Sequence, residues 1–286
     1  MLQLLFLIVC LAAMLSGTPA HAINEAATSN EKFAVYYSDK ISSQALMPYH
    51  LVVLDGSHHP SIPQLKENGK VVLGYLSIGE VDSTDPHFAA LNAHKLILME
   101  NKNWKGSYFV DIRDPMWPKI VIEEMIPNIL RQGFDGIFLD TIDNPIELED
   151  KNVKLYAGMT DATVHLIEGI RLNFPSIKIM MNRGYPLLPK VAKSLNMELG
   201  ESVYTDYNFD TKTYQKTDKE SYQEDVKALK DAQKTNTDLK VYTLDYANPS
   251  DLQNLKEIYR TERANGFIPY VSTIGLDQIV PEPNPN

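Results

Sequence analysis

Eight short apolar segments alternate with longer amphipathic segments, and this alternation is what most restricts the fold. The apolar segments are rich in Val, Ile, Tyr and Phe and span residues 33–37, 51–55, 70–77, 134–140, 177–182, 197–203, 239–245 and 267–272. Several are apolar without interruption, which is typical of parallel strands buried on both faces. Eight strand–helix units in about 250 residues predict an α/β fold, a single-domain (β/α)8 TIM barrel. An open doubly wound sheet is the alternative, but the first turn lacks the Gly-rich dinucleotide fingerprint.

Helix signals fall between the predicted strands. Asp114 followed by Pro115 is typical of an N-cap, and it predicts a helix to residue 131 that Pro127 should kink. Further helices are expected at 153–173, 222–234 and 250–265, the last capped by Ser250. A short additional strand is expected at 108–112, within the long third connection.

The two ends of the chain differ from its middle. An apolar run precedes Ala20-His21-Ala22, which predicts a secretory signal peptide cleaved after Ala22. The start of the run has no Lys or Arg, which is atypical of a signal peptide. An uncleaved membrane anchor is the alternative. We therefore expect a signal peptide at 1–22, a flexible lead-in at 23–30, the barrel domain at 31–278 and a disordered Pro/Asn-rich tail at 279–286. This organisation predicts a secreted or periplasmic protein that is not in the membrane after cleavage.

Charge and residue counts exclude several functions. The chain has 27 Lys and Arg against 37 Asp and Glu, a net charge of −10, which argues against a nucleic-acid partner but tolerates a cationic substrate. The only cysteine, Cys10, lies in the predicted signal peptide, so the mature chain would have no disulfide and no zinc–cysteine site. No HExxH, Walker A or GxSxG motif is present. We expect no cofactor and no metal, and a monomer.

Carboxylates stand at or near the ends of most predicted strands. They are Asp55, Glu80, Asp111, Asp140, Asp143, Glu198, Glu201 and Asp245. In a parallel barrel the carboxyl ends of the strands form one mouth, so these groups should converge. Like charges brought together raise pKa values, and one neutral carboxyl beside one ionised carboxylate is what glycoside hydrolysis requires. Nearby aromatic residues, among them Tyr75, Trp104, Trp117 and Tyr246, suit stacking on sugar rings.

Six segments of the chain resemble blocks of glycoside hydrolase family 114, the endo-α-1,4-polygalactosaminidase-like barrels, and in the same order. They are residues 74–80, 110–113, 133–143 (GFDGIFLDTID), 181–184, 201–204 and 244–247. The resemblance covers approximately residues 33–276, nearly the whole predicted mature chain. It implies a (β/α)8 fold and hydrolysis of α-1,4 linkages in galactosamine-containing exopolysaccharides, including biofilm matrix polymers.

The resemblance also implies roles for individual residues. The family's two catalytic acids match Asp140, which would be the nucleophile, and Glu201, which would be the acid/base of a retaining mechanism. Retention predicts a carboxyl–carboxyl separation of about 5–5.5 Å, and inversion roughly 6.5–9.5 Å. Glu198 competes with Glu201 for the second role, but alternation along a strand lets only one of them face the mouth. The expected substrate-binding shell consists of Asp55, Tyr75, Glu80, Asp111, Asp143, Arg183, Asp245 and Tyr246, where Arg183 would alternatively lower the pKa of a catalytic carboxyl.

Two other classes of function remain open from the sequence. A carbohydrate-binding barrel without turnover would have the same fold, because fold does not fix function. A metal-dependent polysaccharide hydrolase or deacetylase would use the carboxylates as ligands, although the seven histidines form no convincing Asp-His-His triad.

Overall fold

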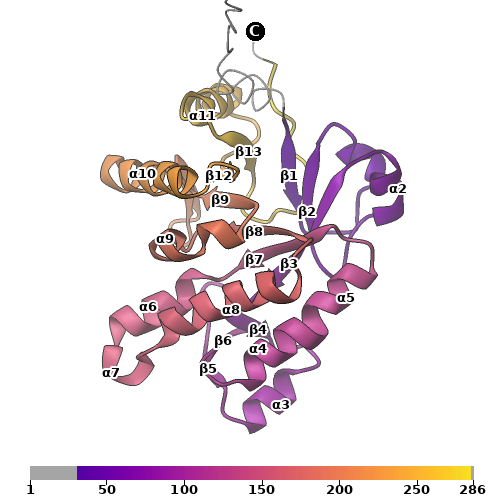
Figure 1. Cartoon of the computed structure of the whole chain (residues 1–286). Coiled ribbons are helices and arrows are strands. Elements are labelled where there is room, and N and C mark those ends of the chain that lie inside the picture. Colours follow the sequence, from indigo (N-terminus) through magenta and orange to yellow (C-terminus); the bar gives the residue numbers. More distant parts are fainter. Residues whose placement is uncertain (1–30, 285–286) are drawn as a thin grey trace, which may run out of the picture.

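The structure is a computed structural model that describes residues 31–284. Its core is an eight-stranded parallel sheet in the order β1 (Phe33–Tyr36), β2 (Leu51–Leu54), β3 (Val71–Ser77), β7 (Gly136–Asp140), β8 (Lys178–Asn182), β9 (Met197–Glu201), β12 (Lys240–Tyr246) and β13 (Ile268–Ser272). β13 also packs beside β1, so the sheet curves into a nearly closed barrel with the helices around its outside (Figure 1). The eight predicted strands and the TIM-barrel fold are confirmed.

The connections between strands are less regular than an ideal barrel. The long helices are α8 (Met159–Asn173), α10 (Lys219–Thr235) and α11 (Leu252–Ala264). Shorter helical segments are η1 (Ser43–Leu46), α2 (Ile62–Glu67), α3 (Phe88–Ala93), α6 (Asp143–Lys151), α7 (Val153–Tyr156), η3 (Tyr185–Leu187), α9 (Leu188–Val191) and η4 (Ala192–Ser194). The predicted helix at 153–173 is thus divided, because Gly158 adopts φ of 87° between α7 and α8.

The predicted helix at 114–131 is continuous but not uniform. It consists of α4 (Met116–Ile120), a π-helical segment η2 (Val121–Met125) and α5 (Ile126–Arg131). Asp114 accepts a hydrogen bond from the Met116 N–H, as a capping carboxylate does. The π segment ends just before Pro127, whose ring and missing N–H do not fit the regular α ladder. The N-cap expected at Ser250 is instead Asp251, whose carboxylate accepts from the Asn254 N–H.

Two antiparallel insertions extend from the carboxyl ends of barrel strands. After β3, the strands β4 (Glu80–Asp82), β5 (Ile97–Glu100) and β6 (Ser107–Val110) form a small sheet, which contains the additional strand predicted near 108–112. After β9, β10 (Thr205–Asn208) and β11 (Thr213–Lys216) form a hairpin. Both insertions lie on the same end of the barrel as the ends of β3 and β9.

The predictions for the termini have different outcomes. The predicted signal peptide and lead-in lie outside the described residues. The prediction of a disordered tail was wrong for residues 279–284, because Val280 is buried and Glu282 accepts a hydrogen bond of 2.9 Å from Arg263. Within residues 31–284, no helix combines the length and the apolar character needed to span a membrane.

One glycine shows how tightly neighbouring barrel strands pack. A Cβ atom on Gly136 would lie 1.8 Å from the carbonyl oxygen of Lys178 on the adjacent strand, and backbone atoms cannot move away without breaking the ladder. We expect Gly136→Ala to lower the free energy of unfolding by at least about 3 kcal/mol, measured by urea denaturation. Gly169→Ala is the control, because its Cβ would meet only Ile122 at 3.6 Å within a helix, where Ala is favoured over Gly. Equal stabilities for the two variants would contradict the packing argument.

Candidate active site

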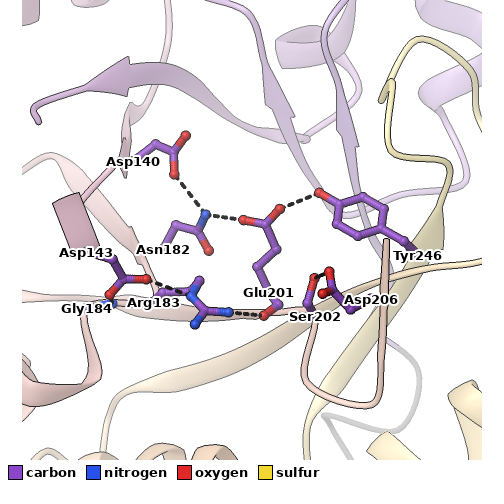
Figure 2. Close-up of polar contacts among 9 residues, drawn as sticks. All are labelled: Asp140, Asp143, Asn182, Arg183, Gly184, Glu201, Ser202, Asp206 and Tyr246. Carbon is purple, nitrogen blue, oxygen red and sulfur yellow. Dashed lines mark hydrogen bonds and ion pairs between the residues drawn. The ribbon is translucent and has the colours of Figure 1, made fainter. Parts of the chain in front are cut away.

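Three adjacent strands, β7, β8 and β9, end in Asp140, Asn182 and Glu201, and these three side chains meet at the mouth of the barrel (Figure 2). The amide nitrogen of Asn182 donates to Oδ1 of Asp140 over 2.9 Å and to Oε2 of Glu201 over 2.5 Å. The two carboxylates are therefore bridged by one nitrogen atom, and 42 and 19 residues of sequence separate them from Asn182. Asn182 was missed as a site residue, although it lies in the block 181–184 and is a polar residue at the end of an apolar run.

Tyr246 completes the surroundings of Glu201. It is the last residue of β12, and its hydroxyl donates to Oε1 of Glu201 over 2.5 Å (Figure 2). Both oxygens of Glu201 therefore accept a hydrogen bond, one from Asn182 and one from Tyr246. This orients the carboxyl group toward the Asp140 side of the mouth.

The surroundings of Glu201 shift its pKa in both directions. Burial and the negative charge of Asp140 raise the pKa of Glu201, while the hydrogen bonds from Tyr246 and Asn182 and the charge of Arg183 lower it. The net effect is a raised pKa, which favours the protonated carboxyl form. A raised pKa is the property required of a general acid, which must hold a proton at the start of the reaction.

Two tyrosines border Asp140 on the other side. The rings of Tyr37 and Tyr75 meet edge to face with centroids 5.1 Å apart. Burial and the nearby charge of Asp140 raise the pKa of both hydroxyls well above the ordinary value, so both remain protonated. Tyr75, which the sequence analysis assigned to the substrate-binding shell, thus lies beside Asp140.

Arg183 and Asp143 form an ion pair next to the two carboxylates. The guanidinium Nε of Arg183 donates to Asp143 over 2.7 Å, and its Nη1 donates to the backbone oxygen of Glu201 over 3.0 Å (Figure 2). The Gly184 N–H donates to the other oxygen of Asp143. This ion pair and the Arg183 hydrogen bond to Glu201 link the start of α6 to the ends of β8 and β9, so both residues stabilise the site.

A residue with left-handed backbone conformation follows each of the three central residues. Thr141, Arg183 and Ser202 have φ of 63°, 56° and 59°, and they come directly after Asp140, Asn182 and Glu201. For residues other than glycine this conformation costs about 1–2 kcal/mol. Three consecutive strands thus turn sharply just past the site, which is typical of strained functional positions.

Glu198 and Glu201 face opposite sides of β9, as alternation predicts. Glu198 is fully buried, and neither of its oxygens has a hydrogen-bond partner among the described residues. Burial and the charge of Asp143 raise its pKa well above the ordinary value, so it is a neutral acid in the packing between the barrel and its outer layer. Glu201 is the one of the two that reaches Asn182 and the mouth.

Like Asp143, the other four predicted substrate-binding carboxylates accept hydrogen bonds from the protein itself. Glu80 is 4% exposed and accepts hydrogen bonds from the side chains of Asn101, Ser107 and Asn144. Asp111 forms a bidentate ion pair with Arg113. The prediction that Glu80 binds substrate was wrong, because this carboxylate is buried. Asp111 instead forms an ion pair with Arg113.

Asp55 and Asp245 also bind backbone groups. Asp55 accepts from the N–H groups of Ser57 and His58 in the turn after β2. Asp245 is fully buried on the outer face of β12 and accepts from the N–H groups of Tyr204 and Thr205, so its predicted role in substrate binding was wrong. Its neighbour Tyr246 faces the interior instead, because successive residues of a strand point to opposite faces.

Asp245 lies close to a second buried acid, Glu262 of α11. Burial raises the pKa of Asp245, and burial together with the charge of Asp245 raises that of Glu262 to about 8. Both groups bind protons more strongly in the folded state than in the unfolded state, where their pKa is about 4. The stability from these groups is present below about pH 4 and is lost as the pH rises through the folded pKa values.

We therefore expect the melting temperature to fall as the pH rises from about 5 to 8, and Glu262→Gln to reduce this fall, because an uncharged amide cannot ionise. Scanning calorimetry at several pH values measures the effect. Glu168→Gln on the exposed face of α8 is the control and should keep the slope of the wild type. An unchanged slope in Glu262→Gln would contradict the assignment.

An acidic cavity of about 690 Å³ adjoins Glu201. It runs from Glu201 and Arg183 to the β10–β11 hairpin and the first turns of α10, and its carboxyl groups are Glu201, Asp206, Asp218, Glu224 and Asp225. Burial and the neighbouring carboxylates raise the pKa of Asp225 to about 6. Its two cations, Arg183 and Lys216, are paired with Asp143 and Glu257. Residues 31–284 hold no group of three His, Cys, Asp or Glu side chains arranged for a metal ion.

Comparisons with known proteins found related sequences. The model of glycoside-hydrolase family GH114 matches residues 16–284. An uncharacterised protein of Deinococcus radiodurans is 24% identical over 259 residues, which are 86% of this chain and 80% of the relative. The family-model match covers the barrel and both insertions.

Solved structures share the fold. The glycoside hydrolase domain of PelA from Pseudomonas aeruginosa superposes with a TM-score of 0.76 at 22% identity, over 88% of this chain and 98% of that domain. Aspergillus fumigatus Ega3, solved in complex with galactosamine, superposes with a TM-score of 0.65 at 13% identity, over 88% of this chain and 95% of that protein. Because the family model spans the barrel from end to end, the chain is a glycoside hydrolase and belongs to family GH114, the family that its sequence blocks resemble.

Proposed function

We propose that the protein cleaves α-1,4 linkages in a galactosamine-containing exopolysaccharide, with retention of configuration at the anomeric carbon. The observation that carries the proposal is the Asn182 bridge. Contacts of 2.9 Å and 2.5 Å to one nitrogen place the two carboxylate oxygens no more than 5.4 Å apart, the sum of the two contacts. This upper limit is compatible with the separation of about 5–5.5 Å of retaining enzymes and lies below the roughly 6.5–9.5 Å of inverting enzymes.

Asp140 is the proposed nucleophile and Glu201 the proposed acid/base. Asp140 attacks the anomeric carbon while Glu201 gives its proton to the glycosidic oxygen, which leaves with the departing chain. Glu201, now ionised, then takes a proton from water, and the water oxygen displaces Asp140 from the sugar. Asn182 holds both carboxyl groups in place, and Tyr246 stabilises the ionised form of Glu201.

The acidic cavity supports an amino sugar as substrate. Its carboxyl groups suit the ammonium group of a galactosamine residue, since charge-assisted hydrogen bonds to carboxylates are among the strongest available. Ega3, which has the same fold, was solved in complex with galactosamine. The apolar run before Ala22 supports the proposal that the enzyme acts outside the cytoplasm, on a matrix polymer.

Defined oligomers of galactosamine and N-acetylgalactosamine test the function. Mass spectrometry should find shorter oligomers, and proton NMR should find the α anomer at the new reducing end before mutarotation. The β anomer as first product would overturn retention. Oligomers that lose acetyl groups without chain cleavage would overturn the hydrolase in favour of a deacetylase, and oligomers that bind without any change would leave a carbohydrate-binding barrel.

Tyr246→Phe tests the proposed control of the Glu201 proton. The hydroxyl lowers the pKa of Glu201, so its loss raises that pKa and preserves the acid form to higher pH. We expect the alkaline limb of the kcat/KM profile to move up by about one pH unit, since a hydrogen bond to a charged group contributes about 1.5–3 kcal/mol. Tyr242→Phe is the matched control: on the same strand, its hydroxyl donates to Glu31 instead, and the limb should not move. A limb that stays in place in Tyr246→Phe would contradict the proposed role.

A further inference from the structure

Thr141, the residue that follows the proposed nucleophile, combines a strained backbone with several polar contacts. Its φ of 63° lies in the left-handed region, where a β-branched side chain is rare because its Cβ atom crowds the neighbouring carbonyl oxygen. Such strain persists only where the surrounding structure compensates for it, and it is concentrated at functional sites. Glycine adopts this conformation freely, so the presence of a threonine points to a contribution from its side chain.

The Thr141 hydroxyl makes three contacts that join two neighbouring strands. It accepts from the N–H of Gly79 over 2.8 Å and lies 2.8 Å from the hydroxyl of Ser77. It also donates to the backbone oxygen of Asp140 over 2.6 Å. Ser77 is the last residue of β3 and pairs with Asp140, the last residue of β7. One hydroxyl therefore ties the end of the nucleophile's strand to the turn that follows β3.

The turn that follows β3 is itself held in place, so it gives Thr141 a fixed support. The Ile78 carbonyl accepts from the indole N–H of the buried Trp117 over 2.8 Å. The Gly79 carbonyl accepts from the Val110 N–H of β6 over 3.0 Å. A Cβ atom on Gly79 would lie 2.3 Å from the backbone oxygen of Thr141, so the turn and Thr141 are in direct contact. The helix α4 and the small β4–β6 sheet thus anchor the segment to which the Thr141 hydroxyl binds.

The carbonyl of Asp140 is held by two donors. Its oxygen accepts from the Ile78 N–H over 3.1 Å and from the Thr141 hydroxyl over 2.6 Å. Since a residue has only two soft backbone dihedrals, fixing this peptide group fixes the direction in which the Asp140 side chain leaves the strand. A displacement of about 1 Å at a reacting group can lower a rate by about 100-fold. The Thr141 contacts therefore act where small movements of the nucleophile have large effects.

We propose that Thr141 is a positioning residue, whose hydroxyl fixes the carboxylate of Asp140 at the distance from Glu201 that the two-carboxylate reaction requires. The inference rests on the proposed function, because it assigns Thr141 a part in that reaction. Thr141 acts through Asp140 and takes no part in the making or breaking of bonds.

Three variants of the full chain separate the role of the hydroxyl from that of the turn. Thr141→Ala removes the hydroxyl, Thr141→Gly removes it and also relieves the strain, and Thr141→Ser retains it. On galactosamine oligomers, we expect Thr141→Ala and Thr141→Gly to lower kcat by about 100-fold with little change in KM, and Thr141→Ser to restore most of the activity. If Thr141 served the turn alone, Thr141→Gly would be at least as active as Thr141→Ser, and this result would overturn the proposal.

A second measurement does not depend on turnover. The charge of Asp140 raises the pKa of Glu201, so this pKa reports how close the two carboxylates are. In Thr141→Gly a loosened Asp140 moves away from the like charge, so the pKa of Glu201 should fall by about half a unit or more, whereas Thr141→Ser should leave it unchanged. Carbon-13 NMR titration of the carboxyl groups measures this pKa, and Glu201→Gln identifies the signal. An unchanged pKa in Thr141→Gly would overturn the proposal. The other groups that act on this pKa remain in place in these variants: Tyr246, Asn182 and Arg183.

Lys95 provides the control for the backbone, because it has the same left-handed conformation, with φ of 62°, and is exposed after α3. Lys95→Gly should keep the kcat and the Glu201 pKa of the wild type. Ser77→Ala should lower kcat in the wild type but add little to Thr141→Ala, because the two hydroxyls belong to one network. If the wild type cleaves no oligomer but Thr141→Gly shows the expected fall in pKa, the proposed hydrolysis fails while the positioning role stands.

Discussion

Replacing Asp140 with Asn is expected to lower kcat by at least about 10⁴-fold, on the order of the loss seen when a catalytic nucleophile is removed. An amide does not attack the anomeric carbon, so no covalent intermediate forms. The amide oxygen still accepts the hydrogen bond from Asn182, and the repulsion between Asp140 and Glu201 disappears. The melting temperature should therefore stay the same or rise, which separates lost chemistry from lost folding.

Release of reducing ends from a galactosamine oligomer measures this effect, with the melting temperature recorded in parallel. Asp231→Asn is the matched control, since this carboxylate lies on α10 and pairs only with surface lysines. It should retain the activity of the wild type. Activity of Asp140→Asn within 10-fold of the wild type, in a purified and folded sample, would remove Asp140 from the nucleophile role.

The barrel was predictable because its strands are buried on both faces. Continuous apolar runs such as residues 51–54 and 71–76 have no polar face, and this pattern with intervening helices leaves few architectures. The same property hides the orientation of each strand. In a strand without a polar face, nothing in the sequence tells which of two neighbours, such as Asp245 and Tyr246, points inward.

The candidate site was predictable where it consists of charged strand ends. Asp140 and Glu201 stand at such ends, and the resemblance selected them among eight carboxylates. Asn182 lies in one of the six blocks but was not selected, because its function follows from its position between two carboxylates that the folded barrel brings together. The contact between the rings of Trp104 and Phe209 was not predictable either, because it joins the tips of two insertions whose short strands give weak periodicity.

Glu201→Ala, combined with azide, provides the most direct test of the second assignment. Without the acid/base, kcat on the polymer should fall by about 10³-fold, because general acid–base catalysis contributes about 10²–10⁴-fold. An aryl α-galactosaminide, whose leaving group needs no proton, should still form the intermediate on Asp140. Azide then displaces Asp140 from the anomeric carbon and needs no general base, so turnover should recover and the product should be the α-glycosyl azide.

The neighbouring acid Glu198 makes this experiment decisive. Glu198 is buried without a hydrogen-bond partner among residues 31–284 and has a raised pKa, so Glu198→Gln replaces a neutral acid by a neutral amide of the same shape. We expect it to keep the activity of the wild type and to show no response to azide. If azide instead rescued a Glu198 variant and not Glu201→Ala, the acid/base would be Glu198. A β-glycosyl azide from Glu201→Ala would mean that azide had attacked the substrate directly, as it does when the nucleophile is missing. Glu201 would then be the nucleophile and Asp140 the acid/base.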